Sequence, residues 1–283
     1  MCCHGQAQDY LISRAAEEFT LVGVLRYAPA NPAGALAKRL SRYLNPIRLA
    51  EYLTARLMLP AEERRAAALA KALFEKSNSQ SFGDDAIPQH KVEDINQPEA
   101  VEFVSKCDPD IVLVNGTNLI KRDLLSLRDK IQHGFLNLHT GLSPYSRGGN
   151  CNLFMLLEGK PELVGVTVHQ IDLGIDRGDI VRSAQTPMEL SDNYEMIEWR
   201  SFYLGIEMLL ESASDVAGGH VVQIRQWEKG KLFLRRTGYV YRPFYRVLVN
   251  RAIKRGLIRD YMQDKAGRDA SVRLVGESRL SAC

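Results

Sequence analysis

Short apolar runs alternate with helix-like segments through the middle of this chain, and this alternation constrains the fold more than any other feature. Strand-like runs occur at 20–27, 108–116, 134–138, 163–171 and 179–185, and helical patterns occur between several of them. The run DPDIVLVNG at 108–116 is apolar on both faces, as in a central parallel strand. This order predicts an α/β fold, with a Rossmann-like, mostly parallel sheet and helices on both faces.

The two ends of the chain depart from this pattern. A helical pattern at 6–19 precedes the first strand-like run, so the first strand of the sheet is expected to be missing. Either the start codon is placed too late, or a central strand is truly absent. Residues 33–76, which Pro46 and Pro60 interrupt, predict a helical insertion of two or three helices. A long amphipathic helix is expected over 193–214, followed by a last strand over 219–227.

The composition is that of an ordinary globular protein. Of the 283 residues, 45% are hydrophobic and 25% are charged, so the core needs no disulfide framework. The five cysteines are odd in number and form no C-x-x-C pair, which favours a reducing compartment over a zinc ribbon. No run of 18 apolar residues and no secretory signal are recognisable, so a cytoplasmic location without a membrane span is expected.

The segment GFLNLHTGLSPYSRGGN, residues 134–150, is the first candidate for a functional site. Asn137 and His139 are two positions apart on a strand-like run, so their side chains point to the same face. A polar loop follows at the carboxyl end of that strand, where open α/β sheets bind ligands. An amide can stabilise a developing oxyanion, and an imidazole can exchange a proton near neutral pH.

The turn DLGIDRGDI supplies carboxylates, which this pair lacks: Asp172, Asp176 and Asp179. The turn joins two strand-like runs, so it is expected at an end of the sheet, where a carboxylate can approach the imidazole. Converging Asn, His and Asp side chains suit acyl transfer to an amine. Each feature alone is more often structural, because N-x-H pairs, acidic turns and Gly-rich loops are common in sequences that carry no site.

In order and spacing, these elements resemble the catalytic core of the folate-dependent formyltransferases. That family includes methionyl-tRNA formyltransferase, phosphoribosylglycinamide formyltransferase and the sugar N-formyltransferases. Its pattern of N-x-H, a Pro-containing loop ending in Gly, G-[VT]-[ST]-V-H and D-x-G-x-D-x-G-x-I reads here NLH, TGLSPYSRGG, GVTVH and DLGIDRGDI. The resemblance covers 134–185 and extends more loosely over about 86–215. It departs in the loop, where the family often has S-L-L-P.

The resemblance implies a formyltransferase fold, with Asn137, His139 and Asp176 as the catalytic trio. It implies 10-formyltetrahydrofolate as the formyl donor, and no metal. His169, the histidine of GVTVH, is expected to be structural. The donor site is expected in the strand-to-loop region VNGTNLI and in the acidic turn, with the candidates Asn115, Gly116, Thr117, Asn118, Leu119 and Asp172.

The end of the chain is basic: residues 225–259 hold eleven Lys or Arg and one acid, interleaved with aromatic residues. This pattern indicates either an anion-binding arm or a solvated basic helix that packs through its aromatics. We expect a catalytic domain over 1–226 and a basic, aromatic-rich and helical extension over 227–283. The extension is shorter and more helical than the β-barrel domain of the tRNA-acting enzymes. A tRNA acceptor is therefore disfavoured, and a small, anionic amine such as an amino-sugar nucleotide is expected.

Four alternatives to this function stay open. The chain could resemble methionyl-tRNA formyltransferase in its acceptor, or it could hydrolyse 10-formyltetrahydrofolate, with water in place of the amine. A non-catalytic folate-binding relative is a third alternative. A metal-dependent hydrolase using His139, His169 and Asp176 is the fourth.

Overall fold

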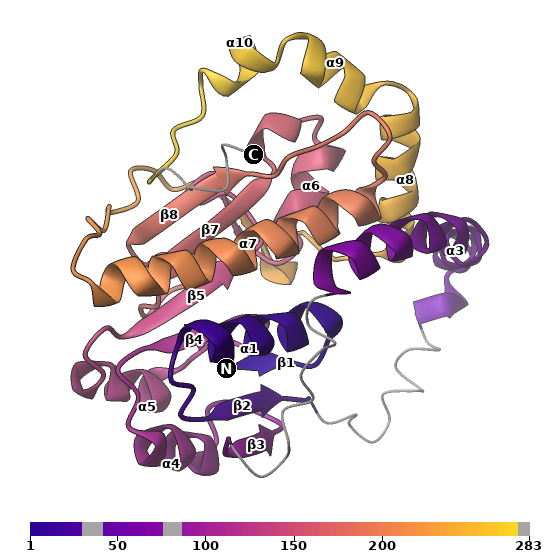
Figure 1. Cartoon of the computed structure of the whole chain (residues 1–283). Helices are drawn as coiled ribbons and strands as arrows, with labels where there is room; N and C mark the ends of the chain where they lie inside the picture. The colour runs from indigo at the N-terminus through magenta and orange to yellow at the C-terminus, as the bar shows by residue number, and fades with distance from the viewer. Residues whose placement is uncertain (30–41, 76–86, 277–283) are drawn as a thin grey trace.

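The computed structural model describes residues 1–29, 42–75 and 87–276 (Figure 1). Helices and strands alternate along most of this length, in the order β1 Cys2–Cys3, α1 Gln6–Glu18, β2 Val24–Tyr27, α3 Pro46–Phe74, β3 Gln89–Val92, α4 Pro98–Cys107, β4 Val112–Val114, α5 Arg122–Leu125, β5 Phe135–His139, β6 Ser146–Gly148, α6 Cys151–Leu157, β7 Gly165–Gln170, β8 Ile180–Gln185, α7 Tyr194–Ala217, β9 Lys231–Phe233, α8 Pro243–Lys254, α9 Leu257–Gln263 and α10 Lys265–Asp269. The predicted α/β class is confirmed.

The main sheet is mixed, with parallel pairs on one side and antiparallel pairs on the other. β1, β2 and β3 pair in parallel, as do β4 and β5. A single parallel bridge between Cys2 and Asn115 joins these two groups of strands. β7 pairs antiparallel with β5, and β8 pairs antiparallel with β7. The sheet is therefore mostly parallel, as the sequence predicts, and β5 lies where the two pairing modes meet.

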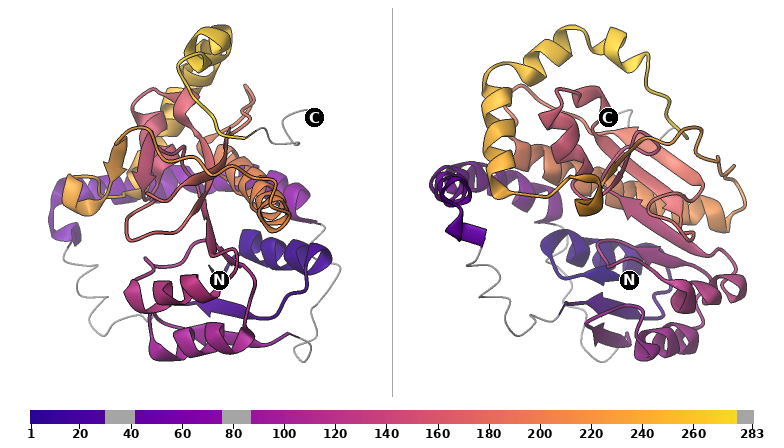
Figure 2. Two further views of the ribbon diagram at one scale, coloured as in Figure 1. Left: turned by 90° about the vertical axis from the view of Figure 1, so that its left-hand side faces the viewer. Right: turned by 180° about the vertical axis from the view of Figure 1, so that it is seen from behind.

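Helices cover both faces of this sheet (Figure 2). On one face α1 and α7 pack against Leu136, Leu138, Val166 and Val168. On the other face α4 and α5 pack against a second apolar cluster, which includes Phe135. Residues alternate between the two faces along a strand, so Asn137 and His139 share the face of Phe135.

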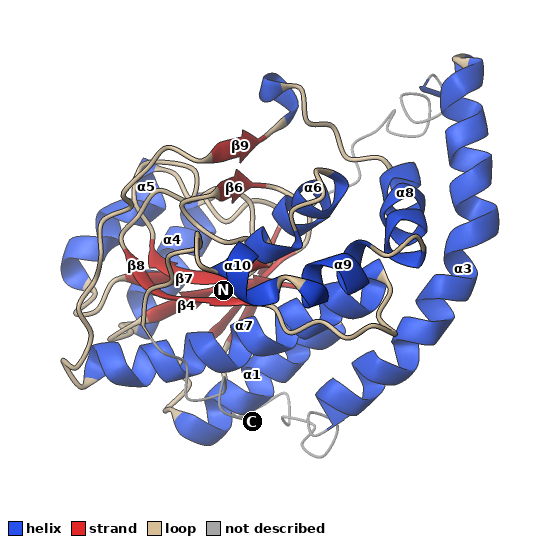
Figure 3. Ribbon diagram, turned by 90° about the horizontal axis from the view of Figure 1, so that it is seen from above, coloured by secondary structure: helices blue, strands red, loops and turns tan. Residues whose placement is uncertain are grey.

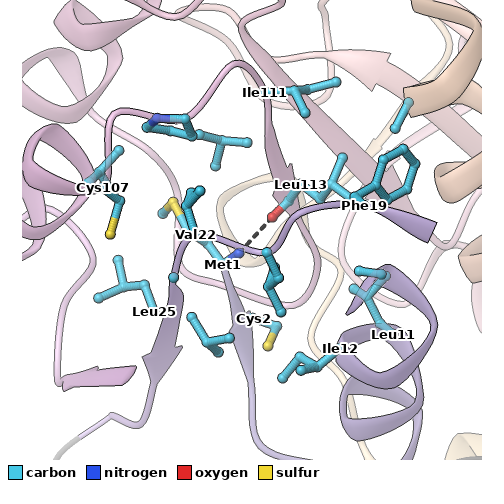
Figure 4. Close-up of a pocket in the computed structure, with 18 of the residues that line it drawn as sticks. Met1, Cys2, Leu11, Ile12, Phe19, Val22, Leu25, Cys107, Ile111 and Leu113 are labelled. Atoms are coloured by element: carbon cyan, nitrogen blue, oxygen red, sulfur yellow. Dashed lines mark hydrogen bonds between the residues drawn. The ribbon is translucent and has the colours of Figure 1, made fainter. Parts of the chain in front are cut away.

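The first strand is shortened rather than missing, which corrects the expectation from the sequence. β1 contains only Cys2 and Cys3, because a helical pattern begins at Gln6. The amino group of Met1 continues the strand and donates a 2.6 Å hydrogen bond to the carbonyl of Leu113 (Figure 4). Beside it lies an apolar cavity of about 130 Å³, whose lining includes Phe19, Val22 and Ile111. Burial lowers the pKa of this amino group, because the charged form is poorly solvated there.

The insertion contains one long helix rather than the expected series broken at Pro60. α3 begins at Pro46, with the side chain of Asn45 accepting hydrogen bonds from the N–H groups of Ile47 and Arg48. It continues through Pro60, although an interior proline costs about 3 kcal/mol. Packing on both sides of the proline offsets this cost: Ala55 and Leu59 lie in one apolar cluster, and α3 also packs along α7. Residues 33–41 and 76 of the predicted insertion lie outside the described residues.

The last strand expected at 219–227 is not formed. Within this segment only Ile224 makes a bridge, to Ile180 at the start of β8. The segment is largely exposed, so it lacks the buried face that stabilises a strand.

The extension after residue 226 returns to the core. β9 pairs in parallel with β6, forming a two-stranded ribbon apart from the main sheet (Figure 3). Phe233 of β9 is buried and stacks on Phe154 of α6, with their centroids 5.0 Å apart. The predicted helical character is confirmed by α8, α9 and α10. The domain boundary at 226/227 stays a prediction.

Much of the basic charge of the extension is paired internally. Arg242 contacts Glu51 of α3 at 2.8 Å. Arg246 contacts Glu63 of α3 and Glu195 of α7, both at 2.8 Å. These pairs favour the second reading of the basic segment, in which it packs on the domain.

Candidate active site

β5 presents both residues of the N-x-H motif near the carboxyl end of the parallel strands. Asn137 pairs in register with His169 of β7, and His139 pairs with Thr167. The imidazole of His139 is buried, and its Nε2 lies 3.3 Å from the carbonyl oxygen of Ser146. The amide of Asn137 is half-buried and lines a cleft.

The acidic turn after β7 brings Asp176 against these side chains. Its Oδ2 lies 3.6 Å from Nδ1 of His139, and its Oδ1 lies 3.5 Å from Nε2 of His169. The N–H of Gly148 donates to Oδ2 at 2.8 Å. Asp176 has a φ of 48°, in the left-handed region that non-glycine residues seldom adopt. Such strain persists where the surrounding structure imposes it, and it is frequent at functional residues.

Two further residues hold this turn in place. Gln226 donates its side-chain amide to the carbonyls of Asp176 and Gly178, at 2.8 and 3.0 Å. A side chain at Gly178 would lie 1.6 Å from the carbonyl oxygen of Gln170, so the backbone passes too close for any residue but glycine. The position of Asp176 is thus fixed by contacts from both ends of the turn.

His169, for which the sequence predicts a structural role, lies in the same polar cluster as Asn137 and Asp176. Its Nδ1 lies 2.7 Å from the carbonyl oxygen of Gln170, so Nδ1 carries the proton in the neutral ring. Nε2 lies 3.1 Å from the amide nitrogen of Asn137 and 3.5 Å from Oδ1 of Asp176. In the neutral ring it accepts from the amide, and in the protonated ring it donates to the carboxylate. One hydrogen of the Asn137 amide is used in the bond to Nε2, and the other is available to a ligand in the cleft.

The surroundings lower the pKa of both the Asp176 carboxyl group and the His139 imidazole, for different reasons. Burial alone would raise the pKa of Asp176, but His139, His169 and the Gly148 N–H lower it well below its usual value. Burial lowers the pKa of His139, and the nearby Asp176 carboxylate only partly offsets this effect. At neutral pH the site therefore holds an ionised carboxylate beside a neutral imidazole.

The cleft next to this cluster has a volume of about 340 Å³ and is lined by both predicted regions. Thr117, Asn118 and Leu119 line it from the loop after β4, and Asp172 lines it from the acidic turn. Oδ1 of Asp172 is buried and has no hydrogen-bond partner among the described residues. A buried acceptor without a partner costs free energy, so this oxygen suits a donor group on a ligand.

Two of the candidates for the donor site do not line the cleft. Asn115 is buried, and its side chain accepts a 2.7 Å hydrogen bond from Gln8 of α1. Gly116 has a φ of 72°, and a Cβ there would lie 2.8 Å from the sulfur of Cys3. These two residues join β1 and α1 to the end of β4, which is a structural task.

Other residues of the cleft gave no signal in the sequence. Leu234 lines it from beyond β9, and only the pairing of β9 with β6 brings it there. Ile175 and Ile171 line it beside Asp172 and Asp176, so the acidic turn contributes apolar surface as well as charge. For His169, the sequence signal was the alternating pattern of GVTVH, which predicts a strand that carries this histidine near its end.

Among the described residues, no group of three or more His, Cys, Asp and Glu side chains is arranged to hold a metal ion. The hypothesis of a metal-dependent hydrolase therefore finds no support in this part of the chain. The helices of residues 1–29, 42–75 and 87–276 also include none long and apolar enough to cross a membrane.

The Rossmann-like sheet and the polar cluster at its central strands are typical of α/β proteins that act on a bound ligand. The sequence profile of the formyl transferase family matches residues 59–212, more than half of the chain. This chain belongs to the formyl transferase family.

Individual relatives agree with this assignment. A methionyl-tRNA formyltransferase of Citrifermentans bemidjiense is 29% identical over 132 residues, covering 47% of this chain and 41% of that protein. This chain thus spans less than half the length of that curated relative. The solved phosphoribosylglycinamide formyltransferase of Anaplasma phagocytophilum matches with a TM-score of 0.50 at 14% identity, covering 82% of this chain and 95% of that one. This second likeness shows that the fold is shared.

Proposed function

We propose that this chain transfers a formyl group from 10-formyltetrahydrofolate to a primary amine of a small acceptor. The observation that carries the proposal is the convergence of Asn137, Asp176 and two histidines beside one cleft. The family assignment supports the reaction type, and the residue types fit acyl transfer.

The cleft fits the donor in its chemistry. A pterin ring is flat, largely apolar on its faces and rich in N–H groups at its edge. The cleft offers the apolar side chains of Val114, Ile120 and Ile171 together with the unpartnered Oδ1 of Asp172. A ring between these walls would bury apolar surface and give that oxygen a hydrogen bond.

The polar residues then have distinct tasks in the reaction. Bound 10-formyltetrahydrofolate supplies the activated formyl carbon. Asn137 donates its remaining amide hydrogen to the formyl oxygen, where negative charge develops as the amine attacks. Asp176 stays ionised and stabilises the positive charge that develops on the attacking nitrogen. The neutral imidazole of His139, adjacent to Asp176, can take the proton that this nitrogen loses. The bond between the formyl carbon and N10 of the donor then breaks, N10 takes up a proton, and tetrahydrofolate leaves.

The acceptor follows less directly from the site. The extension packs on the core through α8 and β9, and its arginines Arg242 and Arg246 are paired with acids. This arrangement supports a small acceptor over a tRNA, because the basic segment offers less free charge than its sequence indicates. An amino sugar, free or joined to a nucleotide, is the acceptor class that we propose.

The test is a reaction of the purified chain with 10-formyltetrahydrofolate and a panel of primary amines: dTDP- and UDP-linked amino-dideoxyhexoses, glycinamide ribonucleotide and methionyl-tRNA. Formation of tetrahydrofolate and of the formylated product is followed by mass spectrometry. Formylation of an amino sugar supports the proposal. Formate release without any amine would instead indicate the hydrolase, and formylation of methionyl-tRNA alone would overturn the proposed acceptor class. Folate binding without turnover of any kind would indicate a non-catalytic relative.

A further inference from the structure

A second cavity lies beside the candidate active site and has no place in the reaction described so far. Its volume is about 480 Å³, and its walls come from α3, α7 and the extension. Asn150, at the start of α6, also lines it. Gly148 lies two residues earlier in the chain. It lines the cleft that we propose for the formyl donor, called the donor cleft below, and its N–H donates a hydrogen bond to Asp176. The two cavities thus adjoin the same short loop.

The thiol of Cys151 gives an independent indication that the two cavities are close. Burial, and after it the Asp176 carboxylate, raises the pKa of Cys151, and the Glu198 carboxylate adds to the effect. Asp176 belongs to the donor cleft and Glu198 to the second cavity. One buried side chain therefore lies within electrostatic reach of both.

Aromatic rings form the apolar walls of this cavity. Trp199 and Phe202 come from α7, with their ring centroids 6.1 Å apart. Tyr241 comes from the extension and is 42% exposed. Aromatic faces of this kind pack well against the C–H face of a sugar ring, which is apolar although the edge of the ring is polar.

Glu198 of α7 also lines this cavity and provides a carboxylate. Tyr194 donates a 2.8 Å hydrogen bond to its Oε2. In the described part of the chain, no hydrogen bond reaches Oε1 and no cation lies within ion-pair distance of this side chain. The other acids of the lining differ, since Glu63 and Glu195 share Arg246. Glu198 is therefore the carboxylate of the cavity that is available to a ligand.

We propose that this second cavity binds the sugar ring of the amine acceptor, with Glu198 accepting hydrogen bonds from its hydroxyl groups and Trp199 packing on its C–H face. The inference rests on the proposed function, because it places the acceptor next to the loop that carries Gly148. Burial raises the pKa of Glu198, and the hydrogen bond from Tyr194 and the nearby charge of Arg246 oppose this effect. In its ionised form the side chain only accepts hydrogen bonds, which matches hydroxyl groups.

The lining holds three acids against two cations, Lys71 and Arg246, and Arg246 is already paired with Glu63 and Glu195. This balance favours a neutral sugar ring over a phosphate here, so we place the nucleotide portion outside this cavity.

Direct binding measurements test this inference without any turnover. The chain contains two tryptophans, so Trp227→Phe leaves Trp199 as the sole reporter. Trp227 lies against Tyr145 and Arg273, apart from both cavities. We expect saturable changes in Trp199 fluorescence when a dTDP-linked 3-amino-dideoxyhexose or a UDP-linked 4-amino-dideoxyhexose is added, and no change with dTDP or UDP alone. Calorimetry on the unsubstituted chain gives the same affinities without a reporter variant.

Substitution of the carboxylate gives the sharper result. Glu198→Gln keeps the shape of the side chain and removes its charge, and we expect it to weaken sugar binding on the order of tenfold or more. The matched control is Glu189→Gln, since Glu189 is exposed and pairs with Arg200 outside the cavity. Binding of 5-formyltetrahydrofolate, a stable analogue of the donor, should be unchanged in both variants.

The outcomes separate this inference from the proposed function. Unweakened sugar binding by Glu198→Gln overturns the inference. If none of the sugars binds while the folate analogue does, the inference is also wrong, but donor binding in the first cleft stands, and formyl transfer to another amine is decided by the turnover assay. If the folate analogue itself does not bind, the proposed function fails.

Discussion

The side-chain amide nitrogen of Asn137 lies 3.1 Å from Nε2 of His169, across the antiparallel pair of β5 and β7. His169 in turn directs its Nδ1 to the carbonyl of Gln170 at 2.7 Å. This chain of hydrogen bonds fixes the orientation of the Asn137 amide, so that one N–H is directed by the protein and the other is left for a substrate.

Asn137→Ala should therefore lose most of its formyl transfer. We expect kcat to fall on the order of a hundredfold or more, because one donor to the developing oxyanion is removed. The measurement is steady-state kinetics with the best acceptor found. Affinity for 5-formyltetrahydrofolate serves as the control and should change little. Activity close to that of the unsubstituted chain would show that Asn137 is not the oxyanion donor.

His169 should act through Asn137, as a positioning residue. In His169→Phe the amide of Asn137 loses its acceptor, and we expect kcat to fall about tenfold while KM changes little. His169→Gln offers a side-chain oxygen as an acceptor and should recover part of the rate. A rise in KM without a fall in kcat, or no recovery of the rate in the glutamine variant, would argue for a purely structural role.

Asp176 should make the free energy of unfolding depend on pH in the acidic range. Its pKa is lower in the folded chain than its ordinary value of 3.8, so the unfolded chain binds more protons as the pH approaches that value. The stabilisation is complete above about pH 5 and is lost as the pH falls through the folded pKa. In urea titrations over this range, Asp176→Asn should show a shallower decline in the free energy of unfolding. Parallel declines in the two proteins would contradict this account.

Gly141 leaves no space for a side chain beside the imidazole of His139. A Cβ there would lie 2.4 Å from Nε2 of His139 and 2.7 Å from Cβ of Cys151. Gly141→Ala should destabilise the chain by about 1–3 kcal/mol and reduce activity. Gly149→Ala is the matched control, because a Cβ at that position meets no atom within 4 Å. Thermal unfolding of the two variants makes the comparison, and equal melting temperatures would refute the steric argument.

The amino group of Met1 should make the free energy of unfolding depend on pH at higher pH than Asp176 does, up to about 8. Burial lowers its pKa below the ordinary value of 8.0, so the unfolded chain binds more protons below that pH. Stability should then rise as the pH increases from the folded pKa to about 8. Nα-acetylation removes this titration, so the difference in unfolding free energy between acetylated and free chains should shrink as the pH rises. If this difference in unfolding free energy does not change with pH, folding does not lower the pKa of the amino group, and the prediction is wrong.

The sequence by itself determined the fold class, the family resemblance and the approximate place of the site. The alternation of strand and helix patterns gave the Rossmann-like sheet, since both patterns follow from the local geometry of the backbone. The spacing in NLH put Asn137 and His139 on one face of β5, which the structure bears out. The turn DLGIDRGDI placed an acid at the end of that sheet, and Asp176 lies there.

Only the tertiary structure decided which of these groups meet. The distance from Asp176 to His139, the acceptor role of His169 and the approach of Leu234 through β9 depend on residues far apart in the sequence. The shortening of β1 and the continuation of α3 through Pro60 were likewise decided by packing, which overrides local preference. Local patterns are set by neighbours along the chain, whereas a site is set by contacts between elements, and those contacts form only when the core is complete.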